Sequence, residues 1–164
     1  MIVVSDTSVL TNLAAIGQFD LLHDLYSSVH VANGVREELN AEGKLWPGAR
    51  EADEANWLLR HEIQNQILVT ALRRDLGRGE AESIALALEL KADLVLLDER
   101  EGRRAAQRLG LNTLGIVGIL LEAKVKGIIG KIRPYLDALR RDAGFYLGDA
   151  LYLAVLTEAG EKNG

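Results

Sequence analysis

The sequence contains no cysteine and only three histidines. The lack of cysteine excludes thiol catalysis, cysteine-ligated zinc and iron–sulfur clusters, and it agrees with a reducing compartment. No apolar run reaches the roughly 18 residues that a membrane-spanning helix needs. The N-terminus also lacks the basic region and apolar stretch of a secretory signal. We therefore expect a cytoplasmic protein that does not cross a membrane.

Basic residues are in slight deficit, since 19 Lys and Arg against 24 Asp and Glu give a net charge of −5. This argues against a protein that binds nucleic acid mainly through an overall positive charge. It does not exclude an enzyme that binds phosphates through metal ions, because a carboxylate cluster itself contributes negative charge. The 164 residues, 48% hydrophobic and 26% charged, have an ordinary globular composition. We expect one domain over residues 1–164.

Several familiar motifs are missing. Gly77 and Gly79 lack the third glycine of a dinucleotide fingerprint, and the chain contains neither a P-loop nor a Gly-x-Ser-x-Gly elbow. The three histidines have no metal-ligand spacing. These absences argue against NAD, nucleotide-triphosphate and serine-hydrolase chemistry.

Short apolar runs alternate with helical patterns along the chain. This predicts an α/β fold of three αβα layers, with a central, mainly parallel sheet of four or five strands. Residues 43–48, which include Pro47, interrupt the pattern. The expected strands are 2–4, 29–31, 67–70, 94–97 and 112–114. The expected helices are 9–16, 19–26, one through Val35 and Leu39, 49–63, 80–91, 103–109, 117–126, 129–141 and 149–159.

The two clearest strands both end in aspartate, Asp6 and Asp98. Sites in open parallel sheets form at the carboxyl ends of the strands, where two unpaired carboxylates would repel each other. Mg²⁺ or Mn²⁺, which prefer oxygen ligands, would remove that cost. Each aspartate could instead cap the following helix.

Further acidic residues lie near expected helix starts. Glu80 and Glu82 are about 200° apart around one helix, so they cannot both face one pocket. Glu82, three residues after Gly79, suits the capping-box position. Glu37 and Glu38 lie on the helix through Val35, where either could be ordinary helix surface.

Four segments in this order resemble the PIN-domain ribonuclease family: SDTS at 5–8, VREEL at 35–39, GEAESIALA at 79–87 and LLDE at 96–99. The stretch LGIVGILLEAK at 114–124 and the tail GFYLGD at 144–149 are similar to a prokaryotic, VapC-like branch, long labelled as predicted nucleic-acid-binding PIN proteins. The likeness covers roughly residues 1–129. It implies a PIN-like three-layer fold and metal-dependent cleavage of RNA.

The resemblance also implies a set of site residues. The family's acids fall on Asp6, Glu38, Glu80 and Asp98 as catalytic residues, with Asp6, Glu80 and Asp98 as ligands of Mg²⁺ or Mn²⁺. If the match to the family's motifs is shifted by one residue, Glu99 replaces Asp98, and if it is shifted by two, Glu82 replaces Glu80. The family's small hydroxyl residue falls on Thr7 or Ser8. The third acid is a glutamate where the family usually has an aspartate, which lengthens that side chain by one methylene.

Basic residues beside these acids are candidates for contacts with the RNA backbone: Arg78, Arg100 and Arg103, with Arg36 and Arg104 nearby. They could equally be helix-surface charge. The resemblance implies a toxin of a toxin–antitoxin pair, with RNA as substrate and a possible antitoxin protein as partner. The alternative is a catalytically inactive PIN-like module that binds RNA or a protein. The apolar residues of 117–126, with Ile128, Ile129 and Ile132, further predict a homodimer interface.

Overall fold

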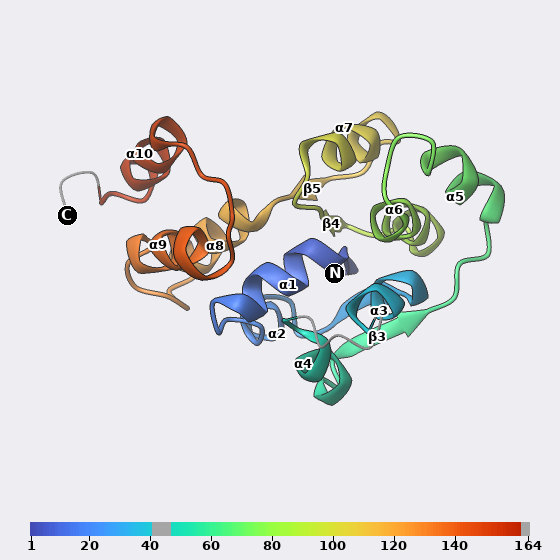
Figure 1. Ribbon diagram of the computed structural model, residues 1–164, viewed down its shortest axis with the longest axis horizontal. Helices are drawn as coiled ribbons and strands as arrows, with labels where there is room; N and C mark the ends of the chain where they lie inside the picture. Colours follow the sequence, from blue (N-terminus) through green and yellow to red (C-terminus); the bar gives the residue numbers. More distant parts are fainter. Residues whose placement is uncertain (41–46, 162–164) are drawn as a thin grey trace.

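Five parallel strands form one sheet in the computed structural model, which describes residues 1–40 and 47–161 (Figure 1). Their order in the sheet is β3-β2-β1-β4-β5, and every neighbouring pair is parallel. The predicted α/β class and mainly parallel sheet are thereby confirmed. The strands are β1 (Val3–Ser5), β2 (Val29–Ala32), β3 (Leu58–His61), β4 (Leu94–Leu96) and β5 (Thr113–Leu114).

The central strands β1 and β4 are the most apolar because helices cover both of their faces. All residues of both strands are buried, with Val4 opposite Val95 and Ser5 opposite Leu96. Continuous apolar runs of this kind are expected where a parallel sheet is covered on both sides. The chain builds outward from β1 to β2 and β3, then returns to place β4 on the other side of β1. The boundary between β1 and β4 is therefore the switch point of the sheet, where such folds form their sites.

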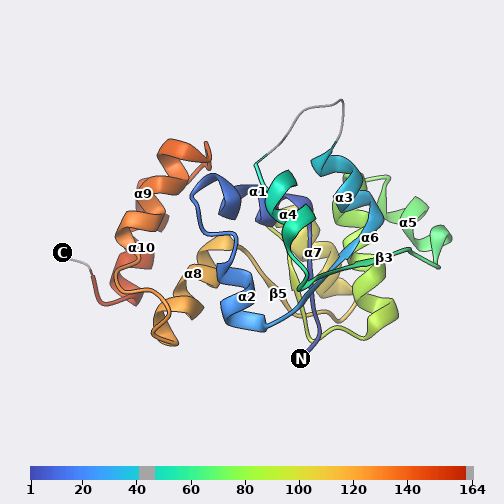
Figure 2. The same cartoon turned by 90° about the horizontal axis from the view of Figure 1, so that it is seen from below.

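Helices form the outer layers of the fold. The helix α6 packs against β1, β2 and β4, and Figure 2 shows it on the opposite side of the strands from α2 and α8. The helix α7 packs beside β5 and α6. The described helices are α1 (Thr7–Ala15), α2 (Leu21–Tyr26), α3 (Asn33–Leu39), α4 (Ala49–Glu54), α5 (Gln66–Leu72), α6 (Arg78–Leu90), α7 (Arg100–Arg108), α8 (Ile116–Val125), α9 (Arg133–Asp142) and α10 (Asp149–Glu158).

Two sequence predictions of secondary structure are wrong. Residues 67–70, predicted as a strand, lie in α5, because the Asn65 side chain caps that helix by accepting from the Leu68 N–H at 3.1 Å. Residues 49–63, predicted as one helix, divide into α4 and the edge strand β3. The interruption predicted at 43–48 falls largely on residues 41–46, outside the described part of the chain.

The last three helices form an extension beyond the sheet, with α9 and α10 at the end of the molecule opposite α5 (Figure 1). The buried Glu161 ties this extension together. Its carboxylate forms an ion pair with Lys124 of α8 and accepts from the Ile132 N–H at 2.8 Å and the Arg133 N–H at 3.3 Å at the start of α9. No described helix combines the length and apolar character needed to span a bilayer.

Candidate active site

Asp6 and Asp98 lie side by side at the switch point of the sheet. The Asp6 N–H continues the β1–β4 pairing by donating to the Leu96 carbonyl at 3.0 Å, and the Asp98 N–H approaches Asp6 Oδ2 at 3.4 Å. Asp6 is fully buried. Burial raises its pKa to about 8, and the charges of Asp98 and Glu80 act in the same direction. Asp6 is therefore a buried carboxyl group whose ionisation is disfavoured by burial and by its acidic neighbours.

Each aspartate also caps a helix. Asp6 Oδ1 accepts from the Val9 N–H at 3.0 Å in the first turn of α1. Asp98 does not cap the helix that follows it, because Glu99 occupies the cap position of α7. Its Oδ1 accepts instead from the Ile116 N–H at 3.3 Å at the start of α8, and its Oδ2 accepts from the Asn12 amide of α1. The capping interpretation is correct for Asp6 and does not exclude a second role.

Glu80 lies near Asp6, in the first turn of α6. Its Oε1 lies 3.4 Å from the Gly77 N–H, which places Glu80, and not Glu82, at the capping-box position. Its Oε2 is buried and has no hydrogen-bond partner among the described residues. Burial raises the pKa of Glu80, and so do the charges of Glu99 and Glu38. A buried carboxylate oxygen without a partner is costly, and a cation would remove that cost.

Glu38 is held from α3 by a hydroxyl. Thr7 Oγ1 donates to Glu38 Oε1 at 2.8 Å, which connects the first turn of α1 to α3. The start of α6 approaches both groups closely at Gly79. A Cβ on Gly79 would collide with Glu38 Oε1 and would lie 2.7 Å from Thr7 Oγ1. A side chain at residue 79 would therefore displace the Glu38 carboxylate from Thr7.

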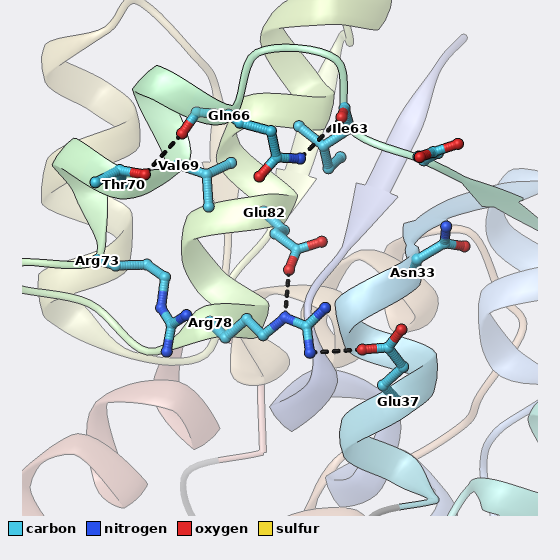
Figure 3. Close-up of a pocket in the computed structure, with 10 residues that line it drawn as sticks. Asn33, Glu37, Ile63, Gln66, Val69, Thr70, Arg73, Arg78 and Glu82 are labelled. Atoms are coloured by element: carbon cyan, nitrogen blue, oxygen red, sulfur yellow. Dashed lines mark hydrogen bonds and ion pairs between the residues drawn. The ribbon is translucent and has the colours of Figure 1, made fainter.

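Glu82 points to a different part of the molecule. It is buried and accepts from the Gly34 N–H at 3.2 Å, at the start of α3, and from Arg78 Nε at 2.6 Å. Figure 3 shows it beside a separate cavity of about 410 Å³, where Arg78 also pairs with Glu37 at 2.5 Å. The structure therefore places Glu80 and Glu82 on different sides of α6. The carboxylates of Glu37 and Glu82 compensate the charge of Arg78.

Four of the other candidate residues line a cavity of about 520 Å³ together with Asp98. Ser8, Glu99, Arg100 and Arg103 all line it. Arg103 donates to the Leu97 carbonyl at 3.0 Å and to the Asp98 carbonyl at 2.7 Å, so it supports the end of β4. Among the other nearby arginines, Arg36 pairs with Asp53.

The acidic side chains at the switch point meet part of what a hard divalent cation requires. Burial raises the pKa values of Asp6, Glu80 and Asp98, and the unpartnered Glu80 Oε2 offers a free ligand oxygen. These features fit an oxygen-ligated ion. Among residues 1–40 and 47–161, however, no three acidic or histidine side chains are arranged to hold one ion. Binding an ion would require these side chains to move closer together.

Two features of this region were missed in the sequence analysis. Asn12 contacts Asp98, and its spacing of four residues from Ser8 on α1 could have indicated a shared helix face. Residues 143–146 and Leu151 line the same cavity from the C-terminal extension. The tail at 144–149 had been noted only for its resemblance, because nothing in its composition indicates what it lies against.

A parallel αβα sheet with carboxylates at its switch point is typical of a class of nuclease folds. The sequence agrees, since residues 2–161 match the family model described as a PIN domain. The chain therefore belongs to the PIN-domain family, whose members are generally nucleases that typically use divalent metals. No curated protein and no solved structure shows significant similarity to it. The VapC-like branch and the roles of individual residues stay predictions.

Proposed function

We propose that the chain is a Mg²⁺- or Mn²⁺-dependent endoribonuclease that hydrolyses phosphodiester bonds of single-stranded RNA. The observation that carries the proposal is the position of Asp6 and Asp98, adjacent to each other at the switch point. Glu80 adds a buried carboxylate oxygen without a partner. Family membership supports a nuclease in general terms.

The residue types suit the chemistry of phosphodiester hydrolysis. Asp6, Glu80 and Asp98 would hold the ion, which supplies a water of lowered pKa and neutralises charge on the phosphate. Asp98 is oriented for this by the Asn12 amide and the Ile116 N–H. Asp6 is oriented by the Val9 N–H. The backbone and α1 therefore hold both aspartates at the switch point before any substrate binds, and from there they would shift to bind the ion.

Glu38 would accept the proton of the attacking water. The Thr7 hydroxyl donates to one of its oxygens, which leaves the other oxygen for that proton. Arg100 is exposed beside Asp98 and would contact a substrate phosphate. Arg103 would act by holding the end of β4, through its bonds to the Leu97 and Asp98 carbonyls.

Cleavage of a labelled single-stranded RNA by the purified protein tests this proposal. We expect cleavage with Mn²⁺ or Mg²⁺, none with EDTA, and none by Asp6→Asn. Asp6→Asn keeps an oxygen to cap α1, so loss of activity would not reflect loss of the cap. Equal cleavage by Asp6→Asn and the parent protein would contradict the proposal.

The biological setting is a further part of the proposal. Family resemblance supports a toxin that acts on RNA in the cytoplasm, is neutralised by an antitoxin protein, and assembles as a homodimer. Induced expression in a bacterial host would then arrest growth, and Asp6→Asn would relieve the arrest. Arrest by both forms alike would contradict a toxin that acts through this site.

Two observations favour the alternative function, an inactive PIN-like module that binds RNA or a protein. Both oxygens of Asp6 face backbone N–H groups, and the described acidic residues do not form a ready metal site. RNA binding without cleavage under every metal condition would favour this module. Isothermal titration with Mn²⁺ separates the two functions further, because the enzyme requires binding that depends on Asp98.

A further inference from the structure

The cavity beside Asp98 is built from three distant parts of the chain. Ser8 and Asn12 of α1 form one side, and residues 98–100 with Arg103 form a second. The third side is the loop between α9 and α10, residues 143–146, with Leu151 of α10. The C-terminal extension therefore forms one wall of a space whose opposite wall carries a proposed catalytic carboxylate.

This loop is held in place at both ends. Gly144 adopts a φ of +63° at the end of α9, and the Phe145 N–H donates back to the Leu139 carbonyl at 3.0 Å. Arg140 donates twice to the Leu147 carbonyl, at 3.0 and 2.5 Å. Leu147 is buried. The backbone on each side of Tyr146 is thus fixed by hydrogen bonds and packing.

Tyr146 itself is 90% exposed, although its two neighbours in sequence are partly or fully buried. Its hydroxyl has no hydrogen-bond partner among the described residues. A large aromatic ring on a fixed loop offers a flat face to a ligand at low entropic cost. Such rings are the usual stacking surface for unpaired bases.

The remaining walls complement the other parts of a nucleotide. Arg100 provides a cation that forms no ion pair with any described residue. Ser8 and Asn12 provide a hydroxyl and an amide, groups that can bond a sugar or a base edge. A stacking face, polar groups and a cation thus lie together beside Asp98.

We infer that this cavity binds the nucleotide next to the scissile phosphate of single-stranded RNA, with its base stacked on Tyr146. This inference rests on the proposed function, because the adjoining carboxylates define which phosphate is cleaved. A site of this kind would favour single strands, since a base inside a duplex cannot stack on a side chain. Stacking is tolerant of sequence, so Tyr146 would contribute affinity more than base identity.

An RNA oligonucleotide containing 2-aminopurine, whose fluorescence falls on stacking, tests the inference. It is titrated with Mg²⁺ present into Asp6→Asn protein, which is not expected to cleave it. We expect quenching on binding, and Tyr146→Ala should raise the Kd about tenfold and remove the quenching. Tyr146→Phe should retain both, because it keeps the ring. Ile67→Ala is the matched control, since Ile67 is 85% exposed on α5, outside this cavity.

A second measurement keeps the inference testable if Asp6→Asn fails to fold. In the otherwise unaltered protein, Tyr146→Ala should raise KM for RNA cleavage about tenfold with little change in kcat. Unchanged KM, Kd and quenching in Tyr146→Ala would overturn the base site and leave the nuclease intact. Tyr146-dependent quenching without cleavage by the parent protein would support the base site and contradict the nuclease.

Discussion

The Asp98 backbone N–H approaches Asp6 Oδ2 at 3.4 Å, which brings two aspartates from the ends of β1 and β4 together at the switch point. Their positions in the sequence differ by 92, and the chain between them forms β2 and β3 before it returns to β4. The charge of Asp98 raises the pKa of Asp6, so the pair is destabilised unless a proton or a cation intervenes. Cleavage assays with and without metal, and stability against pH, separate the proton from the cation.

Replacing either aspartate by asparagine should abolish cleavage and spare the fold. The amide removes a charged oxygen ligand but keeps a hydrogen-bond acceptor, so we expect Asp6→Asn and Asp98→Asn to lose more than about 100-fold in kcat/KM. Cleavage of labelled RNA with Mn²⁺ measures this loss, and circular dichroism checks the fold. Addition of EDTA to the parent protein should have the same effect as either substitution.

The exposed Asp24 of α2 supplies a control for these variants. Asp24→Asn changes the net charge by the same amount at a site away from the switch point. It should cleave as the parent protein does. Equal losses in Asp24→Asn and Asp98→Asn would show that overall charge, and not a metal site, determines activity.

Glu80 and Glu82 should separate activity from stability. Glu80→Gln removes the charge of an unpartnered oxygen, so it should lower activity by more than about 100-fold with little loss of stability. Glu82→Gln loses its ion pair with Arg78, which should lower the free energy of unfolding by about 1–3 kcal/mol while cleavage continues. Urea unfolding and the RNA assay test both. An inactive Glu82→Gln beside an active Glu80→Gln would place the third acid at residue 82.

The sequence was most informative at the centre of the sheet. The apolar runs of β1 and β4 are short, buried and followed at once by polar residues, so the positions of Asp6 and Asp98 could be predicted from them. The fold class followed from the same alternation. Glu80 and Glu82 could be assigned to different faces because helical geometry fixes the angle between them.

Other parts depended on tertiary contacts that no local pattern encodes. The β-branched residues within 67–70 favour a strand by local propensity. Capping by the Asn65 side chain and burial of Val69 stabilise the helix α5 there instead. The edge strand β3 is half polar because it has only β2 as a neighbour. Arg78 lies near Glu80 in sequence, yet its partners are Glu37 and Glu82. Tyr146 reaches the site only through the packing of the C-terminal extension.

The stability of the metal-free protein should depend on pH through Asp6. Burial raises the pKa of Asp6 from its ordinary value of 3.8 to about 8, so the folded chain keeps a proton that the unfolded chain has lost. The contribution of Asp6 to the free energy of unfolding is therefore complete below pH 4 and falls as the pH rises towards 8. Relative to the parent protein, Asp6→Asn should be more stable at pH 8 than at pH 5.

Urea unfolding in EDTA at several pH values measures this difference. Comparison of the two proteins at each pH cancels the titration of the groups that do not interact with Asp6. A difference in stability that stays constant from pH 5 to pH 8 would show that Asp6 titrates outside this range. Added Mg²⁺ should stabilise the parent protein more at pH 8 than at pH 5, because ion and proton compete for the carboxylates.

A side chain at residue 79 should disturb the site more than the fold. A Cβ there would collide with Glu38 Oε1 and crowd Thr7 Oγ1, so Gly79→Ala should displace the Glu38 carboxylate. We expect reduced cleavage with little change in the free energy of unfolding, because the crowded atoms belong to side chains that can move. Gly130→Ala is the matched control, because a Cβ on Gly130 meets no atom within 4 Å and should leave both properties unchanged.

We expect the protein to form a homodimer, and the exposed apolar residues indicate which surface would form the interface. Ile119, Leu120 and Ile132, which the sequence offered for an interface, are fully buried within the chain. The exposed apolar residues of the extension include Val125 on α8, which belongs to the predicted segment and is 87% exposed, and Leu153 on α10, which is 55% exposed. Burial of such side chains in a two-fold interface would contribute stability of association in proportion to the area covered.

Light scattering at micromolar concentration should therefore give a mass of about 36 kDa, twice the 17.9 kDa of one chain. Leu153→Glu should reduce this mass towards one chain, because a charge would be buried in the interface. Ile67→Glu, an equally drastic change at the exposed surface of α5, should leave the mass unchanged. A mass of 17.9 kDa that does not change with concentration would contradict the dimer.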